Sequence, residues 1–135
     1  MINTNIRKMI FLILVLTAVI TAGASYAAVG YFEKTINGQG WVSILYKLRK
    51  STYRKEYTLE LNNPTENRRK LVAVHRMYNY YNESVSKENK TYEGTKTRHA
   101  MDKGDPGQEF YLKFKRENWW DLYAKITGRF SPDRF

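Results

Sequence analysis

The chain has 135 residues, of which 23 are Lys or Arg and 13 are Asp or Glu, so its formal net charge is +10. This length provides one domain's worth of chain and leaves no room for a second sizeable core. The absence of cysteine excludes a disulfide scaffold, a thiolate metal site and a cysteine nucleophile.

The first 27 residues have the three-part layout of a secretory signal peptide. Arg7 and Lys8 precede an apolar run of 12 residues, 9–20, interrupted only by a threonine, and small residues follow. Ser25 and Ala27 form a small-x-small site, which predicts cleavage after Ala27. The apolar run is shorter than the roughly 20 residues that span a bilayer, so a retained anchor is the alternative interpretation.

The sequence therefore predicts a signal peptide over residues 1–27 and a single secreted β domain over residues 28–135. The predicted mature domain keeps 21 bases and 13 acids, because the leader contains two bases and no acid, and its formal charge is +8.

The first half of this domain contains two segments that alternate between apolar and polar residues. Residues 28–40 have no clear period and end in a turn-rich stretch. Residues 41–49 alternate, which predicts a strand with one buried face, and residues 53–61 alternate even more clearly. We expect the segment between them, 49–52, to join these two strands as a hairpin.

The middle of the chain predicts an interior strand. Residues 71–81 carry apolar side chains on both faces, and their valines and tyrosines favour a strand over the competing helix. Loops are expected at 62–67 and 81–90, and a weaker, threonine-rich strand at 91–101.

The last third contains the strongest turn signal. Pro106 and Gly107 suit the central positions of a type II turn. Alternating strands are expected at 109–116 and 119–127, with Gly128 ending the last one. About six strands with short connections predict an all-β fold, an antiparallel β-sandwich or a small barrel.

Few residues have the spacing that catalysis requires. The two histidines, His75 and His99, are 24 positions apart and no cysteine accompanies them, so we expect no metal site and no cofactor. A small basic secreted ribonuclease is an alternative function, because it needs an acid, a base and a phosphate-binding cation. Its candidates are His75 or His99, Glu56 or Glu60, and Arg54, but the sequence assigns no catalytic residue.

Positive charge is the stronger functional signal. It predicts an anion-binding patch made of Lys47, Arg49, Lys50, Arg54, Lys55, Arg68, Arg69 and Lys70. Two further basic clusters occur at 96–103 and at 113–116. A potential of this sign concentrates a protein on polyanions with a strength that falls as salt rises.

Export indicates which polyanions to expect. It argues against cytosolic nucleic acid and favours the anionic polymers of a Gram-positive cell wall, lipid head groups or pyrophosphate-bearing wall precursors. Trp41, Trp119 and Trp120 are the predicted aromatic anchors, because amphipathic rings suit a membrane interface or a sugar face. A second alternative is an exported accessory or immunity-type protein that binds another protein.

Several short features resemble a known family. A signal peptide is followed by Gly40-Trp41 and tyrosine-rich alternating strands, and a late Gly128 precedes residues 130–133, Phe-Ser-Pro-Asp. This arrangement is similar to the small secreted β-sandwich proteins related to the bacteriocin lactococcin 972. The resemblance implies an antiparallel sandwich that interferes with wall synthesis through the precursor lipid II, and it assigns no binding residue.

Overall fold

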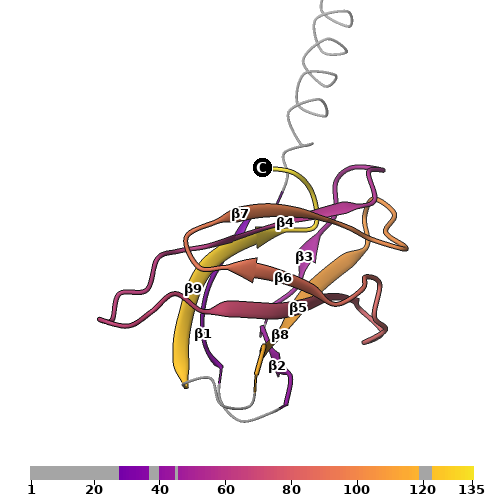
Figure 1. Ribbon diagram of the computed structural model, residues 1–135. Helices are drawn as coiled ribbons and strands as arrows, with labels where there is room; N and C mark the ends of the chain where they lie inside the picture. The colour runs from indigo at the N-terminus through magenta and orange to yellow at the C-terminus, as the bar shows by residue number, and fades with distance from the viewer. Residues whose placement is uncertain (1–27, 37–39, 45, 119–122) are drawn as a thin grey trace, which may run out of the picture.

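The structure is a computed structural model, and it describes residues 28–36, 40–44, 46–118 and 123–135. These residues form nine strands and no helix, so they include no helix that is long and apolar enough to cross a membrane. The strands, labelled in Figure 1, are β1 (Gly30–Ile36), β2 (Val42–Ser43), β3 (Leu48–Arg49), β4 (Glu56–Leu61), β5 (Val72–Asn79), β6 (Asn89–Tyr92), β7 (Lys96–Ala100), β8 (Glu109–Arg116) and β9 (Ala124–Ser131). The expected signal peptide lies outside the described residues.

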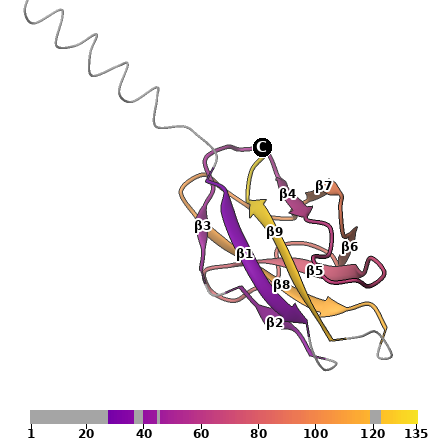
Figure 2. The same cartoon turned by 90° about the vertical axis from the view of Figure 1, so that its left-hand side faces the viewer.

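The strands form two antiparallel sheets. One has four strands in the order β1-β9-β4-β7, and the other has five, in the order β2-β8-β5-β6 with β3 also paired to β8. Figure 2 shows β1 and β9 side by side in the first sheet, crossing over β5 and β8 of the second. The predicted all-β class is therefore confirmed. The two sheets do not close into a barrel, so the architecture is sandwich-like.

The core lies between the two sheets and is built by alternation. In β8, Phe110, Leu112 and Phe114 point inward and are fully buried, and Tyr57, Leu59 and Leu61 do the same from β4. Burying each such side chain contributes about 1.5–3 kcal/mol. The remaining core residues come from both sheets and their connections: Phe32, Ile36, Ile44, Ala73, Met77, Val85, Met101, Ile126 and Phe130.

The N-terminal part of the domain differs from the prediction. Residues 30–36 form β1 rather than an irregular entry, because Phe32 and Ile36 enter the core while β9 pairs along the whole strand. The expected strand over 41–49 is two short strands, β2 and β3, which both pair with β8. The predicted hairpin is wrong, since the next strand, β4, belongs to the other sheet.

The predicted strand over residues 91–101 is also two strands that belong to different sheets. β6 pairs with β5, whereas β7 pairs with β4. The chain turns between them at Gly94, which has a φ of +83°, a left-handed conformation that favours glycine. The buried neighbour Glu93 accepts a hydrogen bond from the backbone N–H of Leu71, which fixes the turn against the start of β5.

Gly128 does not end the last strand but lies inside β9. A Cβ atom at this position would sit 2.1 Å from the carbonyl oxygen of Glu60 on β4. Only glycine allows the two backbones to approach this closely. The predicted tail is partly strand as well, since β9 continues to Ser131, which is fully buried.

Two expectations for the second half of the chain are confirmed. β5 lies between β8 and β6, which makes it an interior strand and accounts for the apolar side chains on both of its faces. Residues 105–108 form a turn in which Gly107 has a φ of +87°. This turn hydrogen-bonds to the backbone of Lys50 from both Gly107 and Gln108, so it is tied to the chain just after β3.

Candidate functional site

The outer side of the five-stranded sheet combines basic and aromatic side chains. Because alternate residues of β8 fill the core, Tyr111, Lys113 and Lys115 point to the outer side of the sheet. The register places β5 residues opposite them on the same side, with Tyr78 facing Tyr111 and Arg76 facing Lys113. We call this surface the aromatic–basic face; its members are Trp41, Lys47, Arg76, Tyr78, Tyr80, Tyr111, Lys113 and Lys115.

Cations of this face rest on aromatic rings. Lys47 Nζ lies 4.3 Å from the centroid of the Tyr80 ring, and Lys113 Nζ lies 4.4 Å from that of Tyr78. The Tyr78 and Tyr111 rings stack at 5.7 Å beneath the two ammonium groups, and the Tyr111 side chain is largely covered, with 7% of its surface exposed. A ring attracts a cation through its quadrupole but carries no net charge to neutralise it.

Arg76 and Lys115 extend this surface toward Trp41. The guanidinium of Arg76 lies 5.9 Å and Lys115 Nζ 4.7 Å from the indole ring. Lys115 also forms an ion pair with Glu88 at 3.0 Å, whereas the described residues provide no ion pair for Lys47, Arg76 or Lys113. Lys47 is exposed, whereas Arg76 and Lys113 are half-buried, and the Nε of Arg76 is buried without a hydrogen-bond partner among the described residues.

The outer side of the four-stranded sheet shows the opposite arrangement. Three of its cations form ion pairs across neighbouring elements: Lys125 with Glu33 at 3.3 Å, Arg129 with Glu60 at 3.2 Å and Arg134 with Glu56 at 2.7 Å. Each of these cations has a carboxylate within hydrogen-bonding reach, which reduces its long-range potential. Lys96 and Arg98 of β7 lie on the same side, exposed and without an ion pair among the described residues, so the two faces differ in how many of their cations are paired rather than in sign.

The residues of the predicted patch do not form one surface. Lys47 and Arg49 lie on the outer side of the five-stranded sheet, where Arg49 is 3.9 Å from Glu109. Four further members are exposed elsewhere, on the loops before β4 and β5: Arg54, Lys55, Arg69 and Lys70. Among the aromatic anchors, Trp41 is on the aromatic–basic face, and Trp119 and Trp120 lie outside the described residues.

Lys50 is buried, with 1% of its surface exposed, so its predicted place in an anion-binding patch is wrong. Its Nζ donates to Asp133 Oδ1 at 3.0 Å and to the carbonyl oxygen of Pro132 at 2.7 Å. The backbone N–H and hydroxyl groups of Ser51 and Thr52 donate to the same carboxylate. Burial alone would raise the pKa of Asp133, but these hydrogen bonds hold it below its ordinary value.

Arg68 also forms an internal ion pair. Its side chain is 8% exposed, and its two terminal nitrogens hold the two carboxylate oxygens of Glu93, which is itself buried. Such a bidentate pair fixes geometry and leaves little of the guanidinium for an external anion. Lys50 and Arg68 therefore support the fold rather than an anion-binding surface.

The two histidines meet inside the molecule. His75 is fully buried, its Nδ1 lies 3.0 Å from the hydroxyl of Tyr57, and its Nε2 lies 2.9 Å from that of Thr91. The His99 ring is 4.7 Å away from that of His75. Burial, and secondly the neighbouring His99, lower the pKa of His75 to about 3, and burial lowers the pKa of His99 as well.

The ribonuclease candidates are not gathered in one cleft. His75 is in the interior, whereas Glu56 and Glu60 are paired with arginines on the outer side of the four-stranded sheet. Arg54 is exposed on the loop before β4. Among the described residues, no three His, Asp or Glu side chains come close enough together to hold a metal ion.

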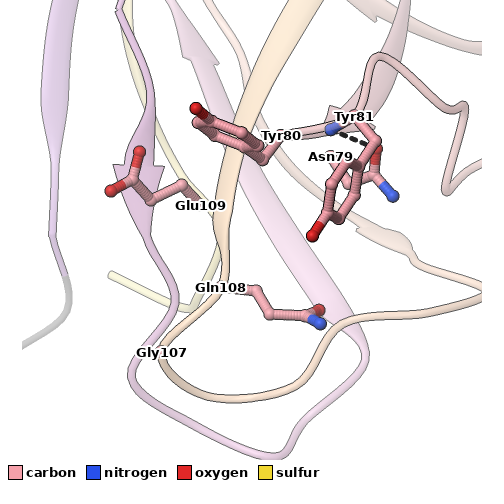
Figure 3. A pocket seen from close by; sticks show the side chains of 6 residues that line it. All are labelled: Asn79, Tyr80, Tyr81, Gly107, Gln108 and Glu109. Carbon is pink, nitrogen blue, oxygen red and sulfur yellow. Dashed lines mark hydrogen bonds between the residues drawn. The ribbon is translucent and has the colours of Figure 1, made fainter.

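A pocket of about 250 Å³ lies at the edge of the aromatic–basic face, where β5 ends and the 105–108 turn leads into β8. Figure 3 shows its six lining residues, with the rings of Tyr80 and Tyr81 on one side and Gln108 below them. Sequence analysis missed this pocket, because its walls come from segments about 28 residues apart in the chain. It also missed Arg76, although its place in an alternating strand was a usable signal.

Comparisons with known proteins identify no relative. No family model, no curated protein and no solved structure matches the chain. The resemblance to the lactococcin 972 family therefore stays a prediction, and the function has to be argued from the described geometry alone.

Proposed function

We propose that this protein is a secreted cationic binding protein that acts at an anionic cell envelope in a bacteriocin-like manner. The observation that supports the proposal is the aromatic–basic face, where Lys47, Arg76 and Lys113 rest on rings instead of carboxylates. Within the described part of the chain, no carboxylate forms an ion pair with these three cations. Its targets would be an anionic wall polymer, a lipid head group or a wall precursor.

The mechanism has two parts. Unneutralised charge first concentrates the protein on a polyanion, an effect that operates over the Debye length of about 8–10 Å at physiological salt. The rings beneath the cations then provide flat amphipathic surface for close contact. The rigid pairing of β5 with β8 holds both kinds of group in a fixed register, so little conformational freedom is lost on binding.

A matched pair of double variants tests the proposal. Lys47→Glu with Lys113→Glu reverses two charges of the face, and Lys96→Glu with Lys103→Glu makes the same charge change elsewhere. Lys96 is a close control because its Nζ also lies 4.3 Å from a ring centroid, that of Phe135. All four lysines lack an ion pair within the described part of the chain.

The readout is sedimentation of the folded variants with isolated Gram-positive cell walls and with anionic vesicles. A unit charge 4 Å from an anion in water is worth about 1 kcal/mol, so the first variant should bind at least about tenfold more weakly. The control should lose clearly less. Equal losses in both variants would show that binding follows net charge and would refute the face as the site.

A further inference from the structure

The pocket beside the aromatic–basic face has walls of two chemical kinds. Tyr80 and Tyr81 are 61% and 77% exposed, and their rings meet edge to face at 5.6 Å (Figure 3). Asn79, Gln108 and Glu109 add amide and carboxylate groups to the same pocket. Exposed aromatic rings next to such groups are a combination that solubility alone does not require.

The tyrosines sit on a turn that is fixed before any ligand arrives. The Asn79 side-chain oxygen accepts hydrogen bonds from the backbone N–H groups of Tyr81 and Glu83, at 3.0 and 2.9 Å. Asn82 has a φ of +61°, and its side chain accepts a hydrogen bond from the hydroxyl of Tyr111. The pocket wall is thereby tied to the aromatic–basic face, which lowers the entropy cost of binding.

The polar groups provide both donors and an acceptor. Gln108 Oε1 accepts from the backbone N–H of Asp105 at 3.3 Å, which orients the amide and leaves its nitrogen as a donor. The Glu109 carboxylate is 40% exposed and makes only a distant ion pair, at 3.9 Å, with Arg49. Lys47, above the Tyr80 ring, places a cation at the edge of the pocket.

We propose that this pocket binds one sugar ring of an anionic glycan, an inference that rests on the function proposed above. The C–H face of a sugar stacks on tyrosine, its hydroxyls need neighbouring donors and acceptors, and the glycan's phosphate or carboxylate is matched by Lys47. The volume of about 250 Å³ is below the roughly 300–1,000 Å³ of drug-sized ligand sites, which fits a single ring.

A lipid occupant fits this surface less well. Within the described part of the chain, the large hydrophobic side chains that are exposed are all tyrosines: Tyr31, Tyr53, Tyr80, Tyr81, Tyr92 and Tyr123. Insertion among acyl chains would favour leucine, phenylalanine or tryptophan, whereas tyrosine keeps a hydroxyl that bonds to sugar or water. The chemistry therefore favours the head of a glycan over a hydrocarbon tail.

The test compares two soluble polymers that differ only in sugar. One is a glycerol phosphate polymer that carries hexose substituents, and the other is the same polymer after the hexoses are removed. Affinities for both are measured by calorimetry with the wild-type protein, with Tyr81→Ala and with the control Tyr53→Ala. Tyr53 is 84% exposed and lies on the loop before β4, so the control removes an equally accessible ring away from the pocket.

We expect the wild type to prefer the hexose-bearing polymer by roughly tenfold, the typical contribution of an aromatic side chain at a binding centre. Tyr81→Ala should abolish the preference and Tyr53→Ala should retain it. Equal wild-type binding to both polymers, or a preference that survives Tyr81→Ala, would overturn the sugar pocket and leave the cationic face standing. Failure to bind either polymer would also overturn the sugar pocket, whereas the cationic face is tested separately by sedimentation with walls and anionic vesicles.

Discussion

The buried histidine pair makes the stability of the domain depend on pH in a range that can be calculated. His75 is fully buried among Tyr57, Thr91, His99 and Phe114, and its two ring nitrogens lie against the hydroxyls of Tyr57 and Thr91 rather than a carboxylate. Protonation would leave a charge in the interior without a compensating acid. The folded protein therefore keeps this ring neutral at pH values where the unfolded chain has already taken up the proton.

The magnitude follows from the two pKa values of His75. Its pKa is about 3 when folded against 6.5 as the ordinary value. Its contribution to stability is complete above pH 6.5 and is lost as the pH falls toward 3, by about 1.4 kcal/mol per pH unit. At pH 5.0 the loss is about 2 kcal/mol, and the lowered pKa of His99 adds to it in the same direction.

Urea unfolding at pH 7.5 and at pH 5.0 measures this loss directly. Asp133 does not interfere, since its pKa is held below its ordinary value of 3.8 and its contribution is lost only in more acidic solution. His75→Gln is the matched variant, because a glutamine amide does not titrate and can still bond to Tyr57. We expect it to remove most of the pH dependence. A wild-type free energy of unfolding that is equal at both pH values would refute the reasoning.

Two substitutions test the internal contacts by urea unfolding at neutral pH. Lys50→Met leaves the buried Asp133 without its cation and should lower the free energy of unfolding by about 3 kcal/mol. The control Lys55→Met changes an exposed site and should lower it by less than about 0.5 kcal/mol. Equal effects would contradict a structural role for Lys50. Gly128→Ala should destabilise by about 1–3 kcal/mol or more, because its Cβ meets the Glu60 carbonyl oxygen, and Gly40→Ala, with open space around it, is the control. A fully stable Gly128→Ala protein would show that β4 and β9 can separate freely.

Local alternation was enough to predict the fold class but not the pairing of strands. Residues 109–116 and 53–61 alternate because one side of each strand fills the core, and both contain a strand in the structure. Which sheet a strand joins depends on contacts far away in the chain. Lys50 meets Asp133 across 83 positions, so the turn after β3 is set by a residue that no local pattern connects to it.

The candidate site was predicted in part for the same reason. A count of bases finds Lys47, Arg49, Lys50 and Arg68 alike, yet the last two are buried against acids that lie far along the sequence. The surface that remains depends on the register between β5 and β8, which places Arg76 opposite Lys113. That register is a property of the folded sheet, and sequence spacing does not reveal it.

The central claim is that the aromatic–basic face, rather than net charge alone, holds the protein on an anionic envelope. The most direct measurement is wall affinity at several salt concentrations for Lys47→Glu with Lys113→Glu and for Lys96→Glu with Lys103→Glu. We expect the first variant to lose both affinity and most of its salt dependence, and the second to keep a salt dependence close to that of the wild type. Indistinguishable curves for the two variants would contradict it.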